Sequence, residues 1–179
     1  PGNNFEEHLK PFTQGAFALD GKTGEASAVM PYYTISSGMD KKYGENVGNS
    51  YNKYLIQDLL RKELGYDGVV CTDWGITHDI GEAEETFAGK CWGVEHMTEA
   101  ERHLKALEAG VDQFGGNNNV APVIEAYRMS CEKYGEEETD VRFRKSAYRL
   151  LLNIFRTGLF ENPYLNLEES VNTVGCPAF

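Results

Sequence analysis

The chain has 179 residues, which is long enough for one ordinary domain with a buried core. Its 28 acidic residues outnumber its 17 basic ones and give a formal net charge of −11, which argues against nucleic acid and anionic membrane as partners. No apolar run approaches the ~20 residues that are needed to span a bilayer. The ten tyrosines, nine phenylalanines and two tryptophans fit carbohydrate recognition, and they also fit any densely packed core.

The cysteines and the first residues narrow the chemistry only a little. Cys71, Cys91, Cys131 and Cys176 are far apart and show no CxxC spacing, which disfavours a metal or redox site. The chain opens on Pro-Gly without an initiator methionine, so we expect a processed protein or a part of a longer one. The compartment therefore stays unknown from the N-terminus.

The first part of the chain alternates helix and strand signals. Residues 5–17 are predicted to form a helix, because asparagines precede them and two glutamates occupy the first turn. A Gly-Lys-Thr-Gly turn separates this helix from a first strand at 26–31. After a loop rich in glycine and asparagine, residues 52–64 place four leucines on one face, and the following glycine ends this second helix.

The middle of the chain reads as strand, loop and helix. Residues 68–71 are β-branched between turn signals, which is typical of a short buried parallel strand. A long loop is expected over 73–97. Thr98 then begins a helix that runs to residue 109, and Glu101 completes a capping box three residues later.

The last part of the chain continues the same alternation. A third strand is predicted at 111–114, followed by a Gly-Gly-Asn-Asn-Asn run. Helices are predicted at 121–134 and 139–157, and the tail after Pro163 is expected to be irregular. Three strand–helix units make only an open half sheet, whereas a complete (β/α)8 barrel takes about 250 residues. We therefore expect an α/β fold of the parallel TIM-barrel type, of which this chain forms roughly the last three βα units plus C-terminal helices.

The most informative stretch is the one that carries Asp73 and Trp74. Asp73 follows the second strand at its carboxyl end, the edge at which parallel α/β folds bind ligands. A carboxylate beside an aromatic ring suits sugar chemistry, because the carboxylate can meet an oxocarbenium-like carbon while the ring stacks on a pyranose. The alternative is that Asp73 caps a following helix and Trp74 simply packs.

Three segments together resemble glycoside hydrolase family 3, the β-glucosidase-type exo-hydrolases. Ala-Val-Met-Pro-Tyr-Tyr at 28–33 looks like that family's strand ending in a substrate-contacting tyrosine. Residues 52–75 are similar to the family signature that ends in Ser-Asp-Trp-Gly. Ala-Gly-Val-Asp-Gln-Phe at 109–114 and Arg-Thr-Gly-Leu-Phe-Glu-Asn-Pro-Tyr at 156–164 complete the match. The order and spacing agree over most of the chain.

The resemblance implies a retaining β-glucosidase. Asp73 would be the nucleophile of a double displacement, in which a glycosyl-enzyme forms and water then hydrolyses it. Tyr33 would lie beside the nucleophile in the glycone subsite, although Tyr32 could equally face the cleft. Trp74 would stack on the aglycone sugar. The substrate would be a β-glucoside or oligosaccharide, and no cofactor is expected because two carboxyls and a water suffice.

The chain departs from the family pattern at both ends. The family's sugar-binding lysine–histidine pair would lie just upstream of Pro1, and the acid/base glutamate usually comes from a later domain. The resemblance therefore implies that residues 1–164 are the second half of the barrel and 165–179 a linker toward a C-terminal domain. The other barrel half and that domain would be partners needed for turnover. Family members are commonly secreted or periplasmic.

Four other functions compete with this interpretation. β-Xylosidases of the same family are a rival that this chain does not exclude, because the glycone pocket would be built largely by residues outside it. Bacterial β-N-acetylglucosaminidases fit less well because they tend to carry a second Asp at the position of Trp74. A phosphate-binding barrel enzyme is suggested only by Gly115 and Gly116 ahead of a helix start. A non-catalytic carbohydrate-binding piece would keep the cleft without turnover.

The remaining polar residues have plainer interpretations. Asp112 lies at a strand end, and we expect it to order the neighbouring loop by accepting backbone N–H bonds. His78 and Asp79 could bind sugar hydroxyls, whereas a metal site is disfavoured because HxxxH and HExxH spacings are absent. His103 falls on a helix and is expected to be a surface or packing residue. The candidates for a second carboxyl in the long loop are Glu82, Glu84, Glu85 and Glu95.

Overall fold

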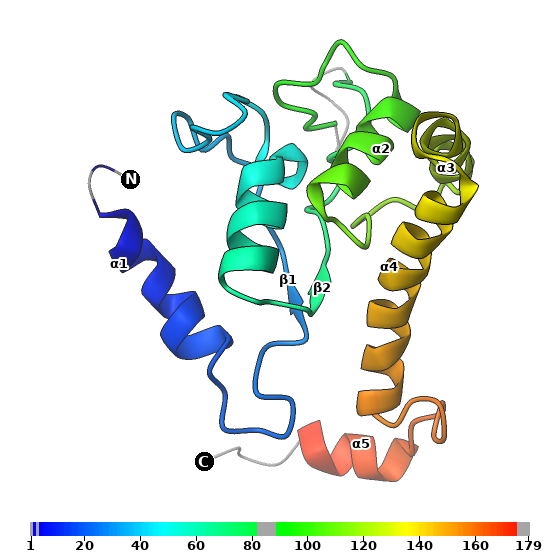
Figure 1. Cartoon of the computed structure of the whole chain (residues 1–179). Helices are drawn as coiled ribbons and strands as arrows, with labels where there is room; N and C mark the ends of the chain where they lie inside the picture. Colours follow the sequence, from blue (N-terminus) through cyan, green and yellow to red (C-terminus); the bar gives the residue numbers. More distant parts are fainter. Residues whose placement is uncertain (1, 3, 82–88, 175–179) are drawn as a thin grey trace.

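The computed structural model describes residue 2, residues 4–81 and residues 89–174 (Figure 1). It contains α-helices, two π-helical segments (η1 and η3), one short 3-10 helix (η2) and two strands. In chain order these are α1 (Phe5–Lys10), η1 (Pro11–Ala16), β1 (Ala28–Val29), η2 (Asn49–Tyr51), η3 (Tyr54–Glu63), β2 (Val69–Val70), α2 (Glu99–Ala109), α3 (Ala121–Tyr134), α4 (Glu136–Arg156) and α5 (Leu167–Val174).

The two strands are parallel and short. Ala28 pairs with Val69 and Val29 with Val70. The predicted third strand is wrong as a paired strand, because the described part of the chain keeps only one parallel bridge there, between Cys71 and Gln113. The Thr72 N–H still donates to the Gln113 carbonyl, whereas the Gly115 N–H donates to the Thr72 side chain. The α/β character is confirmed, and the complete barrel stays a prediction.

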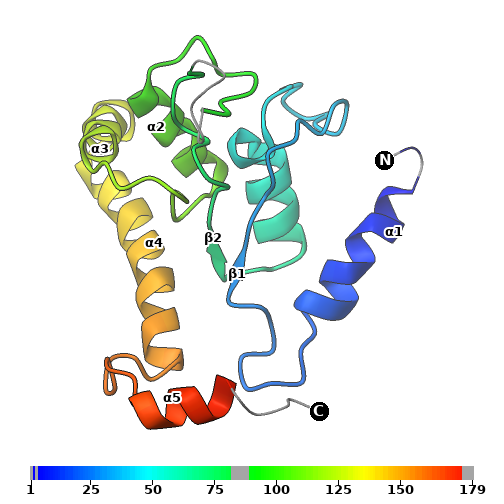
Figure 2. The same ribbon diagram turned by 180° about the vertical axis from the view of Figure 1, so that it is seen from behind.

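Helices cover one side of the strands and leave the other side open. Figure 1 shows η3 in front of the chain that carries β1, and Figure 2 shows that chain in front of η3 from behind. Ala28 and Met30, in and after β1, are exposed. Within the described ranges no helix packs on this open side. No helix of that part of the chain is long and apolar enough to cross a membrane.

The predicted helices are largely confirmed. Residues 5–16 form α1 and η1, and the helix expected over 52–64 forms η3. The α2 helix carries the predicted capping box, in which the Glu101 N–H donates to Thr98 Oγ1 at 3.3 Å and the Thr98 N–H donates to Glu101 Oε2 at 2.6 Å. The α3 helix spans the predicted residues.

Two helix boundaries correct the sequence analysis. The α4 helix begins at Glu136 rather than at residue 139, because three glutamates in its first turn interact favourably with the positive helix N-terminus. The irregular tail is wrong for Leu167–Val174, which form α5. The Asn166 side chain accepts the Glu169 N–H at 3.1 Å and so supports this helix start. Residues 175–179, the end of the predicted linker, lie outside the described residues.

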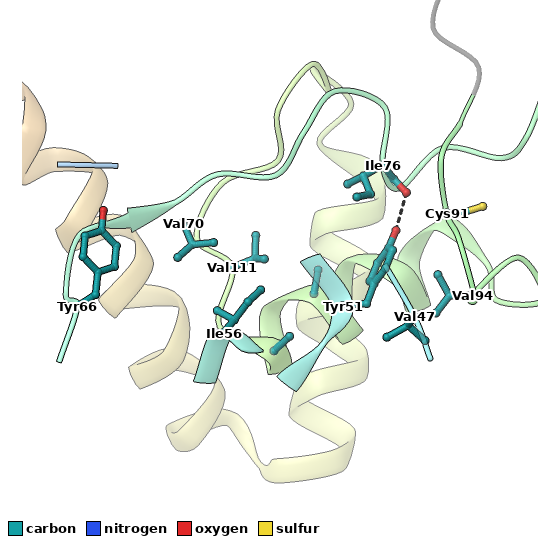
Figure 3. Packing of buried hydrophobic residues seen from close by; sticks show 11 residues of the cluster. Val47, Tyr51, Ile56, Tyr66, Val70, Ile76, Cys91, Val94 and Val111 are labelled. Carbon is teal, nitrogen blue, oxygen red and sulfur yellow. Dashed lines mark hydrogen bonds between the residues drawn. The ribbon is translucent and has the colours of Figure 1, made fainter. Parts of the chain in front are cut away.

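The main core lies between β2, η3 and α2 and supports the end of β2 (Figure 3). Tyr51 is fully buried in it, and its hydroxyl donates to the carbonyl oxygen of Ile76 at 2.5 Å. The core thus holds the chain three residues beyond Asp73. Its buried members are Val47, Tyr51, Ile56, Tyr66, Val70, Ile76, Cys91, Val94, Ala106, Ala109 and Val111.

Candidate active site

Asp73 lies just beyond the carboxyl end of β2, as predicted. Its residue exposure is only 4%, and its Oδ2 atom is buried without a hydrogen-bond partner among the described residues. Burial raises the pKa of this carboxyl above its usual 3.8, and hydrogen bonding by the Tyr32 backbone partly offsets the rise. No helix begins between residues 74 and 81, so the capping alternative is wrong.

The backbone around Asp73 is fixed by Thr72. The Thr72 N–H donates to the Gln113 carbonyl at 2.9 Å, and its buried hydroxyl accepts the Gly115 N–H at 2.9 Å. These bonds join the end of β2 to the loop that follows residue 114. Asp73 therefore projects from a rigid strand end, which is the arrangement that a preorganised nucleophile requires.

Trp74 lies on the backbone of a glycine pair and keeps 49% of its surface exposed. A Cβ atom added to Gly116 would lie 2.3 Å from Trp74 Cδ1, and one added to Gly115 would lie 2.9 Å from Trp74 Cε3. Gly116 also has a φ of +66°, which L side chains rarely adopt. The glycine pair thus supports one side of the indole while much of the ring stays available for stacking.

Tyr33 and Tyr32 border the same strand end. The Tyr33 hydroxyl donates to the Trp74 carbonyl oxygen at 3.0 Å, and Lys90 Nζ lies 5.3 Å from the centre of the Tyr33 ring. Tyr32 is 63% exposed, and its φ of +71° is the only positive value of a non-glycine residue in the described part of the chain. Such strained backbone is concentrated at functional sites. The structure therefore brings Tyr33 and Trp74 together and places the Tyr32 backbone against Asp73.

Asp73, Tyr33 and Trp74 lie in a segment that matches a known protein family. The model of the glycosyl hydrolase family 3 N-terminal domain matches residues 4–151. The chain belongs to glycoside hydrolase family 3. The resemblance found in the sequence is thereby confirmed.

The relatives of this family 3 chain are much longer than it is. It is 40% identical over 175 residues to a β-glucosidase C of Emericella nidulans, a match that covers 98% of this chain and 26% of the relative. It is 39% identical to a periplasmic β-glucosidase/β-xylosidase of Dickeya chrysanthemi, covering 97% and 26% respectively. The solved β-glucosidase of Erythrobacter marinus matches with a TM-score of 0.56 and 26% identity, covering 87% of this chain and 17% of that one. The chain thus spans about a quarter of the curated relatives' length.

Asp112 lies beside Val70 in a cluster of charged side chains that does not include Asp73. Its side chain is fully buried and is paired with Arg61 at 2.5 Å and Arg149 at 3.0 Å. It also accepts the Val70 N–H at 3.1 Å and the Ser146 hydroxyl at 2.7 Å. Asp112 is a structural residue, as expected. The sequence analysis predicted backbone N–H partners, whereas two arginine side chains and one backbone N–H bind it.

The other polar candidates do not assemble beside Asp73. Asp79 pairs with Arg102 at 2.7 Å, and His78 Nε2 lies 3.7 Å from Glu99 Oε1. Within the described ranges no three His, Cys, Asp or Glu side chains group so as to hold a metal ion. Glu95 accepts the Gly93 N–H at 2.9 Å, and this bond lowers its pKa, the opposite of what a proton donor needs. Glu82, Glu84 and Glu85 lie outside the described residues.

Sequence reasoning missed Arg102 on α2, which supports the loop beside the candidate site. Its guanidinium is buried and bonds to the loop that follows Trp74. A buried arginine inside an otherwise amphipathic helix was the available signal. His103, beside it, is a satisfied packing residue as predicted, and burial lowers its pKa so that the imidazole is neutral.

Proposed function

We propose that this chain is the nucleophile-bearing part of a retaining, exo-acting β-glucosidase that hydrolyses terminal β-D-glucosyl residues. The observation that carries the proposal is the buried Oδ2 of Asp73, which has no partner in the described chain. Buried polar atoms without partners are rare and need an explanation. A substrate carbon that this oxygen attacks is such an explanation.

The proposed reaction is a double displacement. An Asp73 oxygen forms a bond to the anomeric carbon while the glycosidic C–O bond breaks, and the leaving oxygen takes a proton from an acid. Water then attacks the same carbon, gives its proton to that acid's conjugate base and releases the Asp73 carboxylate. Only ionised Asp73 can attack. Because burial raises its pKa, the reactive fraction falls earlier on acidification than for an exposed carboxylate.

Tyr33 and Trp74 are the proposed sugar contacts. The Tyr33 hydroxyl donates to the Trp74 carbonyl oxygen, and this contact at the strand end supports the proposal that its ring borders the glycone. The exposed part of the Trp74 indole offers the aglycone sugar a flat apolar surface backed by Gly115 and Gly116. Aromatic rings of this kind bury large area at low entropic cost.

Turnover is proposed to need more protein than this chain. No described carboxylate accompanies Asp73 as a proton donor, and the relatives are about four times as long. We propose that the open side of β1 and β2 is covered by the other half of a (β/α)8 barrel, and that a later C-terminal domain supplies the acid/base. The periplasmic relative suggests a periplasmic or secreted location. The full-length protein means here the protein that carries this chain together with those parts.

Trapping of the glycosyl-enzyme tests the proposal directly. The full-length protein is incubated with a 2-deoxy-2-fluoro-β-glucoside, whose fluorine slows breakdown of the intermediate, and intact and peptide masses are measured. We expect one adduct on the peptide that contains Asp73 and none in Asp73→Asn. No adduct on the full-length protein would overturn the assignment. Sugar affinity that survives Asp73→Asn in a protein without hydrolysis would identify a non-catalytic binding piece instead.

A β-xylosidase is the second candidate, and the name of the Dickeya relative favours it because that name covers both activities. The residues that line the glycone pocket are proposed to come largely from the other barrel half. Rates of hydrolysis of nitrophenyl β-glucoside and β-xyloside by the full-length protein separate the two. A kcat/KM ratio that favours xyloside by tenfold or more would replace the first candidate with the second.

A further inference from the structure

Two neighbouring side chains of α2 connect the loops on both sides of Trp74. Arg102 has a residue exposure of 2% and His103 is fully buried. Both lie in the first turns of the helix, just after its capping box. Neither touches Asp73 or Trp74, and both bind the chain within a few residues of them.

Arg102 fixes the loop that starts at Asp73. Its Nη1 donates to the Thr77 carbonyl at 3.1 Å and to Asp79 Oδ1 at 2.7 Å. Its Nε donates to the Val94 carbonyl at 3.2 Å and its Nη2 to the Glu95 carbonyl at 3.1 Å. Four bonds spread over a planar fork suit a guanidinium, and an ammonium with one nitrogen cannot reproduce them.

His103 fixes the loop that carries the glycine pair. Its Nδ1 lies 2.7 Å from the Glu99 carbonyl, which can only accept, so Nδ1 carries the proton. Nε2 then accepts from Asn117 Nδ2 at 3.2 Å. The same Asn117 nitrogen lies 3.2 Å from Thr77 Oγ1. Asn117 directly follows Gly116. This network therefore joins the loop that carries Gly115 and Gly116 to the loop that follows Trp74.

We propose that Arg102 and His103 are positioning residues that hold Trp74 on the glycine platform formed by Gly115 and Gly116. They thereby set the enzyme's affinity for the aglycone sugar. Arg102 fixes the chain three residues after Trp74, and His103 fixes the chain one residue after the platform. Because both residues belong to one rigid helix, the two loops cannot shift independently. The aglycone part of the proposal rests on the proposed glycosidase function.

Hydrogen exchange of the full-length protein tests the positioning without any substrate. Arg102→Lys is expected to speed exchange of amides in 74–79, because the bonds to the Thr77 carbonyl and Asp79 are lost. His103→Asn keeps a donor for the Glu99 carbonyl and loses Asn117, so it should speed exchange mainly in 113–119. Arg128→Lys on α3 is the matched control, since Arg128 is exposed and pairs with Glu125. Equal exchange in 74–79 and 113–119 for all three variants would overturn the proposal.

Kinetics of the full-length protein test the consequence for the sugar. Arg102→Lys is expected to raise KM for a β-linked disaccharide about tenfold, because a displaced Trp74 weakens aglycone binding. The control Arg128→Lys is expected to have the KM of the unsubstituted protein. A merely structural role would lower kcat through a smaller folded fraction and leave KM as it was. That pattern would refute the role in affinity. If the unsubstituted protein forms no sugar adduct, the glycosidase function fails while the exchange result still decides the positioning. If Arg102→Lys loses its far-UV circular dichroism, His103→Asn carries both tests.

Discussion

The two ends of β2 hold buried aspartates in opposite ways. Asp112 accepts the Val70 N–H and pairs with Arg149 and with Arg61, which in turn bonds to the Gly68 carbonyl just ahead of the strand. Asp73 lies beyond the end of the strand with one buried oxygen that no described group satisfies. The Asp112 carboxylate is surrounded by positively charged side chains. The Asp73 carboxylate has no positively charged partner among the described residues.

This difference assigns a stabilising role to Asp112 and is consistent with a chemical role for Asp73. A buried charge with several partners holds elements together and is costly to break. A buried charge without partners destabilises the fold and is retained where it has a task. In parallel α/β folds the amino ends of strands carry stabilising contacts and the carboxyl ends carry reacting groups, and the proposed role of Asp73 agrees with that division.

Removal of the unpaired carboxylate should have the largest effect. Asp73→Asn is expected to lower kcat of the full-length protein by about 10³-fold or more, because the amide cannot act as the nucleophile. The same change should leave the thermal unfolding midpoint of the chain unchanged or raised, since it removes an uncompensated buried charge. Hydrolysis of a nitrophenyl β-glucoside and calorimetry measure the two effects. A large loss of stability together with activity would mean that Asp73 is a structural residue.

Removal of the paired carboxylate should have the reverse profile. Asp112→Asn leaves buried guanidinium groups without their counter-charge, and we expect the free energy of unfolding to fall by about 3–5 kcal/mol. Urea unfolding of the chain measures this loss. Thr139→Val, which removes a buried hydroxyl from the Ser130 contact at 2.9 Å, serves as a smaller buried-polar control. Equal losses in both variants would show that the arginine cluster has no special weight.

The support under Trp74 gives a smaller and more local effect. Gly116→Ala adds a Cβ that would meet the indole at 2.3 Å, in addition to the strain of a φ of +66°. Gly24→Ala has nearly the same strain, with a φ of +72°, and meets nothing within 4 Å. We expect Gly116→Ala to cost about 1–3 kcal/mol more than Gly24→Ala and to alter acrylamide quenching of tryptophan fluorescence in a Trp92→Phe background. Identical behaviour of the two variants would show that the glycine pair does not support the Trp74 indole.

The position of Asp73 and Trp74 after β2 and most helices could be predicted because their signals are local. Asp73 and Trp74 follow a β-branched run directly, and the capping box of Thr98 and Glu101 lies within four residues. The short apolar segment at 111–114 was misjudged as a strand, since such a run does not distinguish a paired strand from an extended chain that makes one bridge.

The long-range contacts could not be predicted. Arg102 binds Thr77, 25 residues away, and Arg149 reaches Asp112 from another helix, 37 residues away. A single sequence contains no periodicity or spacing for such pairs, because they arise only when the elements pack. Asp112 could therefore be assigned a structural role without its partners being named. Tyr33 was placed by motif, and its bond to the Trp74 carbonyl appears only in three dimensions.

Acid titration should produce the smallest effect, with opposite signs at the two ends. Burial raises the pKa of Asp73 above 3.8, so its contribution to stability falls as pH rises through the window from 3.8 to the folded value, and the gain from Asp73→Asn grows with pH. The Arg149 hydrogen bond lowers the pKa of Asp67, near Asp112, so its contribution is present above 3.8 and is lost as pH falls through the lowered value. Asp67→Asn should therefore cost stability near neutrality, by a small amount because Asp67 is exposed. Urea unfolding between about pH 3 and about pH 7 should give difference curves of opposite sign. Parallel curves would mean that the two ends of β2 do not differ in how they hold charge.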